Sequence, residues 1–170
     1  MPGIDARRAC QAARAWVRTR YGDQRPQPFE RLPAAQPRLR VAYVSRDFGR
    51  HPMSYLMAEV FELHDRSRFE VYAISRAPLS ELPIQQRLRR GFEHFIDARH
   101  WSRAEIVRWM REHDIAIAVD LMGHTEGNVF DAFVQRVAPI QVNYLGYPGT
   151  SGADCMDYII GDRWVTPEAH

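Results

Sequence analysis

From residue 39 onward, short apolar runs alternate with amphipathic stretches in which the apolar positions recur at helical spacing. The apolar runs predict strands at residues 39–45, 69–75, 92–97, 115–121, 140–145 and 158–160. The amphipathic stretches predict helices at residues 53–64, 84–90, 102–113 and 128–136. Strands that alternate with helices are typical of βαβ units. We therefore expect an α/β fold with a Rossmann-like, mainly parallel sheet and flanking helices.

The first 37 residues have a different pattern. Residues 5–20 predict a helix with alanines and Trp16 on one side and Asp5 as its N-terminal cap. Residues 21–37 contain four prolines, which favour a linker over a helix or a central strand. We therefore divide the chain into a helical, Pro-rich junction at 1–37 and an α/β lobe at 38–170. The first helix belongs to an upstream part of the protein or packs on the lobe as an appendage.

Composition narrows the possible functions. The 170 residues carry a net charge of +2, and all 23 basic residues are arginine, so no reaction can depend on a lysine amine of this chain. Residues 1–40 carry a charge of +6, but they lack the interleaved aromatic residues and motifs of nucleic-acid binding, which we do not expect. No apolar run approaches the roughly 20 residues that span a bilayer, so we expect no membrane insertion. Cys10 and Cys155 lie far apart in the sequence, which favours reduced thiols and a cytoplasmic location.

The first candidate for chemistry is the segment DFGRHP, which follows the first predicted strand. Pro52 suits the first position of a helix, so His51 would lie at a helix N-terminus on the carboxyl edge of the sheet. There the helix dipole favours a neutral imidazole, which can accept a proton or a hydrogen bond. The alternative is a histidine that only caps the helix.

The second candidate follows the predicted strand at 115–121. Asp120 and His124 are close enough in sequence for the carboxylate to orient the imidazole. Gly123 would let the backbone approach a ligand, and Thr125 adds a hydroxyl group. The alternative is a turn in which Asp120 accepts hydrogen bonds from backbone amides.

The third candidate is the loop LGYPGTSG at residues 145–152, which contains Tyr147, Pro148 and Gly149. Its glycines and hydroxyl groups can present backbone N–H groups to a phosphate or a peptide. It matches neither the Walker A nor the dinucleotide-binding fingerprint, and a flexible loop is the alternative. We find no metal-binding motif, and we expect no metal cofactor.

Taken together, four segments carry a resemblance to a known family. RLRVAYVSRDFGRHPMSYLM, FEVYAIS, VDLMGHTEG and APIQVNYLGYPGTSGADCMDYIIGD resemble the catalytic region of the protein O-GlcNAc transferases, which have the two-lobed GT-B fold. The resemblance runs from about Arg38 to Pro167. It implies that residues 38–170 form the N-terminal lobe, interrupted before the C-terminal lobe.

This resemblance implies a function as well. Members of the family transfer N-acetylglucosamine from UDP-GlcNAc to serine or threonine of proteins, with inversion at the anomeric carbon and no metal or other cofactor. The implied partners are protein or peptide acceptors, the nucleotide sugar, the missing C-terminal lobe and upstream tetratricopeptide repeats. The basic side chain that stabilises the leaving diphosphate belongs to the second lobe of the family. We therefore expect the isolated chain to be inactive.

Residue roles are also carried over from the resemblance. His51 matches an active-site histidine that acts as general base or as substrate positioner. Asp120 and His124 match the strand-end pair near acceptor and sugar. The residues that match the border of the cleft are Thr125, Tyr147, Pro148 and Gly149.

Three alternatives stay open at this point. A related branch of the family transfers fucose from GDP-fucose, and the residues that select the sugar lie mostly outside this chain. A non-catalytic α/β module that binds a peptide or partner would need no second lobe. A receiver-like signalling domain is disfavoured because it requires a lysine, which this chain lacks.

Overall fold

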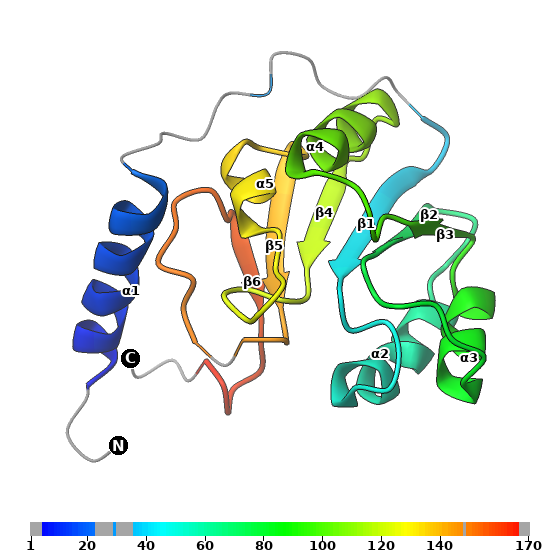
Figure 1. Cartoon of the computed structure of the whole chain (residues 1–170), viewed down its shortest axis with the longest axis horizontal. Coiled ribbons are helices and arrows are strands. Elements are labelled where there is room, and N and C mark those ends of the chain that lie inside the picture. The colour runs from blue at the N-terminus through cyan, green and yellow to red at the C-terminus, as the bar shows by residue number, and fades with distance from the viewer. Residues whose placement is uncertain (1–4, 23–28, 30–35, 148, 167–170) are drawn as a thin grey trace.

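The computed structural model describes residues 5–22, 29, 36–147 and 149–166, and these contain one six-stranded parallel sheet. The strand order is β3-β2-β1-β4-β5-β6 (Figure 1). The strands are β1 Leu39–Ser45, β2 Phe69–Ser75, β3 His94–Asp97, β4 Ile117–Asp120, β5 Ile140–Tyr144 and β6 Tyr158–Ile160. This is the order of a doubly wound Rossmann sheet, so the predicted α/β class and parallel sheet are confirmed.

The central strands have the apolar sequence of strands that are covered on both faces. β1 and β2 pair in register along their full length, from Leu39 beside Phe69 to Ser45 beside Ser75. The last five residues of each strand are buried. The sheet core therefore lies along β1 and β2 and continues into β4.

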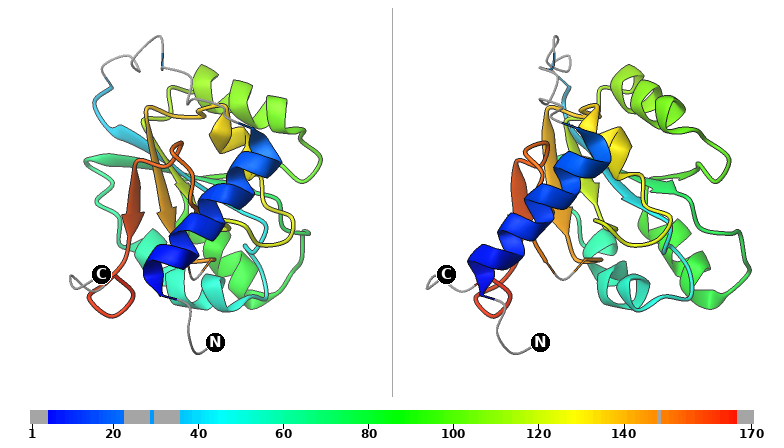
Figure 2. Two further views of the ribbon diagram at one scale, coloured as in Figure 1. Left: turned by 90° about the vertical axis from the view of Figure 1, so that its left-hand side faces the viewer. Right: turned by 60° about the vertical axis from the view of Figure 1, so that its left-hand side comes forward.

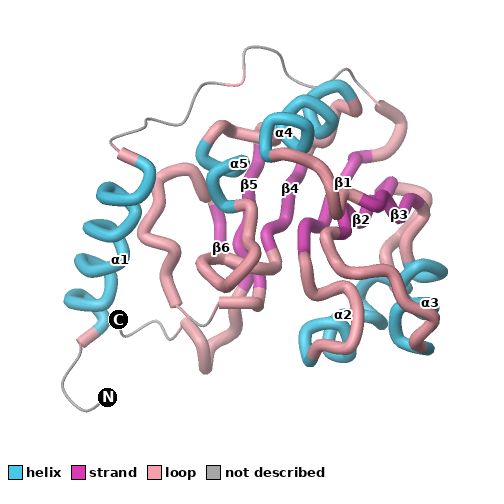
Figure 3. The backbone as a smooth tube through the Cα atoms, viewed as in Figure 1, coloured by secondary structure: helices cyan, strands magenta, loops and turns pink. Residues whose placement is uncertain are grey.

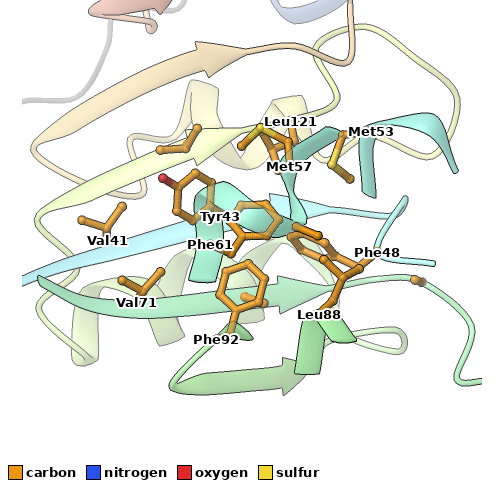
Figure 4. Close-up of a cluster of buried hydrophobic side chains, with 14 of the residues drawn as sticks. Val41, Tyr43, Phe48, Met53, Met57, Phe61, Val71, Leu88, Phe92 and Leu121 are labelled. Carbon is orange, nitrogen blue, oxygen red and sulfur yellow. The ribbon is translucent and has the colours of Figure 1, made fainter. Parts of the chain in front are cut away.

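Helices cover both faces of the sheet. The first face carries α2 Pro52–Glu62 and α3 Pro83–Gly91, whose apolar side chains form one core with the odd-numbered residues of β1 and β2 (Figure 4). The second face carries α4 Arg103–Glu112 and α5 Phe130–Val134, which pack on the even-numbered residues of β1 and β2. Successive strand residues point to opposite faces, so two separate cores follow from the same two strands.

Local hydrogen bonds set the helix ends, and two elements differ in length from the prediction. Ser102 and Glu105 form the predicted capping box at the start of α4. Strand β3 is shorter than predicted, because the backbone N–H of Phe92 closes the last turn of α3 by donating to Leu88. The helix predicted at 128–136 is the five-residue α5. Its N-cap is Val129, and Asn128 lies outside the helix, where it accepts a hydrogen bond from Phe130 N–H.

Helix α1 (Ala6–Tyr21) packs on the α/β body. Asp5 caps it as predicted by accepting a hydrogen bond from Arg8 N–H at 2.7 Å. Figures 1 and 2 show α1 outside the sheet, on the side of β6 and α5. The ring of Tyr21 lies 5.9 Å from that of Phe130 on α5. The predicted linker lies largely outside the described residues, so the boundary at residue 37 stays a prediction.

The strand order places a topological switch point between β1 and β4. The chain moves from β1 outward to β2 and β3, then returns to the other side of β1 to build β4, β5 and β6. The tube in Figure 3 shows the loops after β1 and β4 starting from the same edge of the sheet. Ligands of doubly wound folds bind at this edge, outside the carboxyl ends of the strands. Within the described residues, no helix is long and apolar enough to cross a membrane.

Candidate functional site

The loops after β1 and β4 are in contact at the switch point. The sulfur of Met122 accepts hydrogen bonds from the hydroxyl of Ser45 and from the backbone N–H of Arg46, both at 3.4 Å. The side chain of Arg46 lies against Gly127, where a Cβ atom would collide with the guanidinium group. The two loops that carry the predicted histidines are therefore held as one surface.

The loop that carries His51 is anchored by buried side chains. Phe48 is fully buried in the first core, and its carbonyl accepts a hydrogen bond from the Gln85 side chain at 2.8 Å. The hydroxyl of Ser54 accepts from Gly49 N–H at 3.1 Å and donates to the Asp47 carbonyl at 2.5 Å. The roles of Gln85 and Ser54 were missed from sequence. Gln85 bonds to a residue 37 positions away, and no sequence motif pairs Ser54 with the loop that precedes its helix.

His51 is the N-cap of α2, as predicted. Its Nδ1 accepts a hydrogen bond from Met53 N–H at 3.3 Å and lies 3.7 Å from a carboxylate oxygen of Asp47. Because Nδ1 is the acceptor, the neutral ring carries its hydrogen on Nε2. The side chain of His51 is 46% exposed.

Asp120 organises the turn after β4. Its carboxylate is 1% exposed and accepts from Met122 N–H at 3.0 Å, Gly123 N–H at 2.9 Å and the Asn143 side chain at 3.0 Å. Burial raises the pKa of Asp120 to about 7, and the three N–H donors oppose that rise. The backbone-capping alternative for Asp120 is therefore confirmed.

The predicted contact between Asp120 and His124 is wrong. The Nε2 of His124 donates instead to the carbonyl of Ser151, 2.8 Å away in the loop after β5. Its Nδ1 is left as a buried acceptor that has no hydrogen-bond partner among the described residues. The ring packs against Trp16 of α1 and Phe130 of α5, each at a centroid distance of 4.5 Å.

Tyr147 lies next to His124, with ring centroids 5.4 Å apart. The tyrosine covers Gly123, whose φ is +55° and where an added Cβ would lie 2.5 Å from the Cβ of Tyr147. Gly149 also lies close to this ring: a Cβ atom added to Gly149 would be 3.2 Å from Cε1 of Tyr147. Pro148 lies outside the described residues.

A pocket of about 400 Å³ opens beside His124. Thr125 lines it, although its hydroxyl donates to the Met122 carbonyl at 2.9 Å and thereby supports its own turn. Trp16 closes one side, so α1 is part of the site. The structure thus brings together His124, Thr125 and Tyr147, while His51 lies on the neighbouring loop. In the described part of the chain, no three His, Cys, Asp or Glu side chains are grouped to hold a metal.

Comparison with known proteins agrees with this architecture. The sequence model of glycosyl transferase family 41 matches residues 19–170. The chain belongs to this family. It is 36% identical to an O-GlcNAc transferase of Thermobaculum terrenum (the K341M mutant), with a TM-score of 0.84 over 95% of this chain and 31% of that one. The predicted family, and the Rossmann-like lobe that it implies, are confirmed.

Two curated relatives of the family are 40% identical to the chain. One is the probable UDP-N-acetylglucosamine–peptide N-acetylglucosaminyltransferase SEC of Arabidopsis thaliana, matched over 76% of this chain. The other is the UDP-N-acetylglucosamine–peptide N-acetylglucosaminyltransferase of Caenorhabditis elegans, also matched over 76%. The match covers 13% and 11% of these relatives, so this family 41 chain corresponds to a small part of each.

Proposed function

We propose that the chain is the N-terminal half of an inverting glycosyltransferase that transfers N-acetylglucosamine from UDP-GlcNAc to serine or threonine of proteins. The similarity to peptide N-acetylglucosaminyltransferases over three quarters of the chain carries the proposal. The position of the His51 and His124 loops on either side of the switch point supports it. The proposal includes no metal and no cofactor besides the nucleotide sugar.

Within this proposal His51 positions an oxygen of the acceptor or of the sugar. Its Nδ1 accepts from Met53 N–H, which leaves Nε2–H as the hydrogen-bond donor of the neutral ring. Action as a general base would first require the loss of that capping bond or a change of tautomer. The geometry therefore favours the positioning role of the two that the family resemblance allows.

The other predicted residues have complementary roles in the proposal. Asp120 holds the turn that presents His124, and His124 lines the pocket in which the acceptor or the sugar lies. Thr125, Tyr147, Pro148 and Gly149 border the cleft in which the acceptor lies.

A second lobe, which binds the nucleotide, completes this site in the proposal. Apolar side chains near β6 support a covering partner, because Ile159 is 52% and Trp164 is 79% exposed. Upstream tetratricopeptide repeats guide the acceptor in the same proposal, and the protein acts in the cytoplasm. The chain alone is inactive.

The test combines this chain with the separately expressed C-terminal lobe of a relative. We expect calorimetry to detect UDP-GlcNAc binding, and mass spectrometry to detect sugar on an acceptor protein, only after the second lobe is added. The mass of the product distinguishes transferred N-acetylglucosamine from fucose. Tight donor binding or sugar transfer by the chain alone would contradict the proposal.

The role of His51 is tested in the reconstituted enzyme with His51→Asn. Asparagine can accept the hydrogen bond from Met53 N–H, so it keeps the helix cap while it removes the imidazole. If His51 positions the substrate, the variant has a lower kcat whose dependence on pH is unchanged. If His51 is the general base, the variant loses the limb of the kcat–pH profile that reports the titration of the base. If His51→Asn and His124→Asn leave peptide binding intact and no transfer is found in any form, the chain is a non-catalytic binding module.

A further inference from the structure

Three arginines meet at the carboxyl edge of the sheet, beside the site described above. Arg46 directly follows β1, Arg76 directly follows β2, and Arg99 lies two residues beyond β3. Together with Pro78 and Gly127 they line a pocket of about 370 Å³. Because β1, β2 and β3 are adjacent and parallel, their ends bring together three cations that are distant in sequence.

The positive charge of this arginine pocket is largely uncompensated. Arg99 forms a two-pronged ion pair with Asp97, with N–O distances of 2.8 and 2.9 Å. The guanidinium groups of Arg46 and Arg76 have no hydrogen-bond or carboxylate partner in the residues that the structure describes. Like charges held around one pocket repel one another, and a multiply charged anion relieves that repulsion.

The backbone fixes the arginine pocket in place. Arg46 N–H donates to the sulfur of Met122, and Arg76 N–H donates to the Ser45 carbonyl at 2.9 Å. Gly127 has a φ of +76°, and its missing Cβ leaves the space that the Arg46 side chain occupies. Any other residue at position 127 would displace that guanidinium group.

We propose that Arg46, Arg76 and Arg99 bind a phosphorylated side chain, or two adjacent carboxylates, of a peptide. Arginine forks match the oxygens of phosphate and carboxylate groups. Among the described residues, the pocket is lined by arginine, proline and glycine, and none of these offers an aromatic ring on which a nucleotide base would stack. This lining favours a peptide over a nucleotide. It shares Gly127 with the His124 pocket, so the two are neighbours. The identification of this peptide as the acceptor rests on the proposed function.

The test measures peptide binding to the full chain by fluorescence anisotropy. The probes are a short fluorescein-labelled peptide of glycine and serine with one phosphoserine, its unphosphorylated form, and a form with two adjacent aspartates. We expect the anionic peptides to bind at least about tenfold more tightly than the neutral one, and Arg46→Gln or Arg76→Gln to remove about tenfold of that affinity. Arg108→Gln is the matched control, because Arg108 is an exposed arginine of α4 outside the pocket.

Three results would overturn the assignment. Arg46→Gln and Arg76→Gln proteins that are folded by circular dichroism and bind like the wild type would exclude the arginine pocket. An equal loss in Arg108→Gln would show attraction by overall charge only. Displacement of the peptide by UDP would assign the pocket to the donor. This experiment measures peptide binding and not sugar transfer. A negative result here therefore does not contradict the proposed function, and a failure of sugar transfer does not contradict this binding result.

Discussion

Burial and hydrogen bonding act in opposite directions on the pKa of Asp120, and Asp120→Asn tests which of them is larger. Replacement by asparagine keeps the size of the side chain and removes the titrating proton. Burial of this carboxyl group raises its pKa from 3.8 to about 7 in the folded protein, against the effect of three N–H donors. An aspartate in the unfolded chain titrates near its ordinary value, so between pH 4 and 7 the folded state binds more protons than the unfolded state.

The sign of the effect follows from that proton uptake. Stability contributed by a group with a raised folded-state pKa is complete below the unfolded pKa and is lost as pH rises through the folded one. A shift of about three pKa units corresponds to roughly 4 kcal/mol, at 1.36 kcal/mol for each unit. We therefore expect the stability of the wild type relative to Asp120→Asn to fall by up to about 4 kcal/mol between pH 4 and 8.

The assay is urea unfolding of both proteins at a series of pH values, followed by subtraction. Groups common to both proteins cancel, including Glu70, whose lowered pKa of about 2 acts in the opposite direction. The side-chain amide of asparagine also places an N–H group against one of the backbone N–H donors. This contact lowers the free energy of unfolding of the variant by an amount that does not vary with pH. A difference that is constant with pH would refute the reasoning. A difference that grows in favour of the wild type as pH rises would mean that the N–H donors outweigh burial.

Three further substitutions test the loops and α1. Gly146→Ala forces a Cβ onto the Leu121 carbonyl at a φ of +64°, so we expect a loss of about 3 kcal/mol in urea unfolding. Gly22 has a φ of +75° but open space around it, so we expect Gly22→Ala to lower the free energy of unfolding by only about 1 kcal/mol. Equal losses in Gly146→Ala and Gly22→Ala would contradict the steric argument. Trp16→Ala removes the indole ring that packs against His124. We expect the backbone amides of α1 to exchange hydrogen about tenfold faster, which corresponds to a loss of about 1.4 kcal/mol in the free energy of local opening. Unchanged exchange would mean that α1 is held by other contacts.

The sequence predicted the location of much of the candidate site, because the residues of the site follow strands. The loop glycines and histidines after β1, β4 and β5 were predicted to lie at the carboxyl edge, and the parallel sheet places them there. The sequence also offered the local hydrogen bonds, from the turn amides to Asp120 and from Met53 N–H to His51, but it did not predict the long-range partners. Asp120 and His124 are near in sequence, yet each found a partner in the segment that follows α5: Asn143 for the carboxylate and the Ser151 carbonyl for the imidazole.

The sequence by itself determined the type and order of the elements, the fold class and the family. These depend on the period of apolar residues, on caps such as Asp5 and Ser102, and on motifs within single loops, all of which are local. Only the tertiary structure decided which loops touch. It set Trp16 against His124, and it brought Arg46 and Arg76 to one pocket, because strand order and helix docking depend on contacts between residues far apart in the chain.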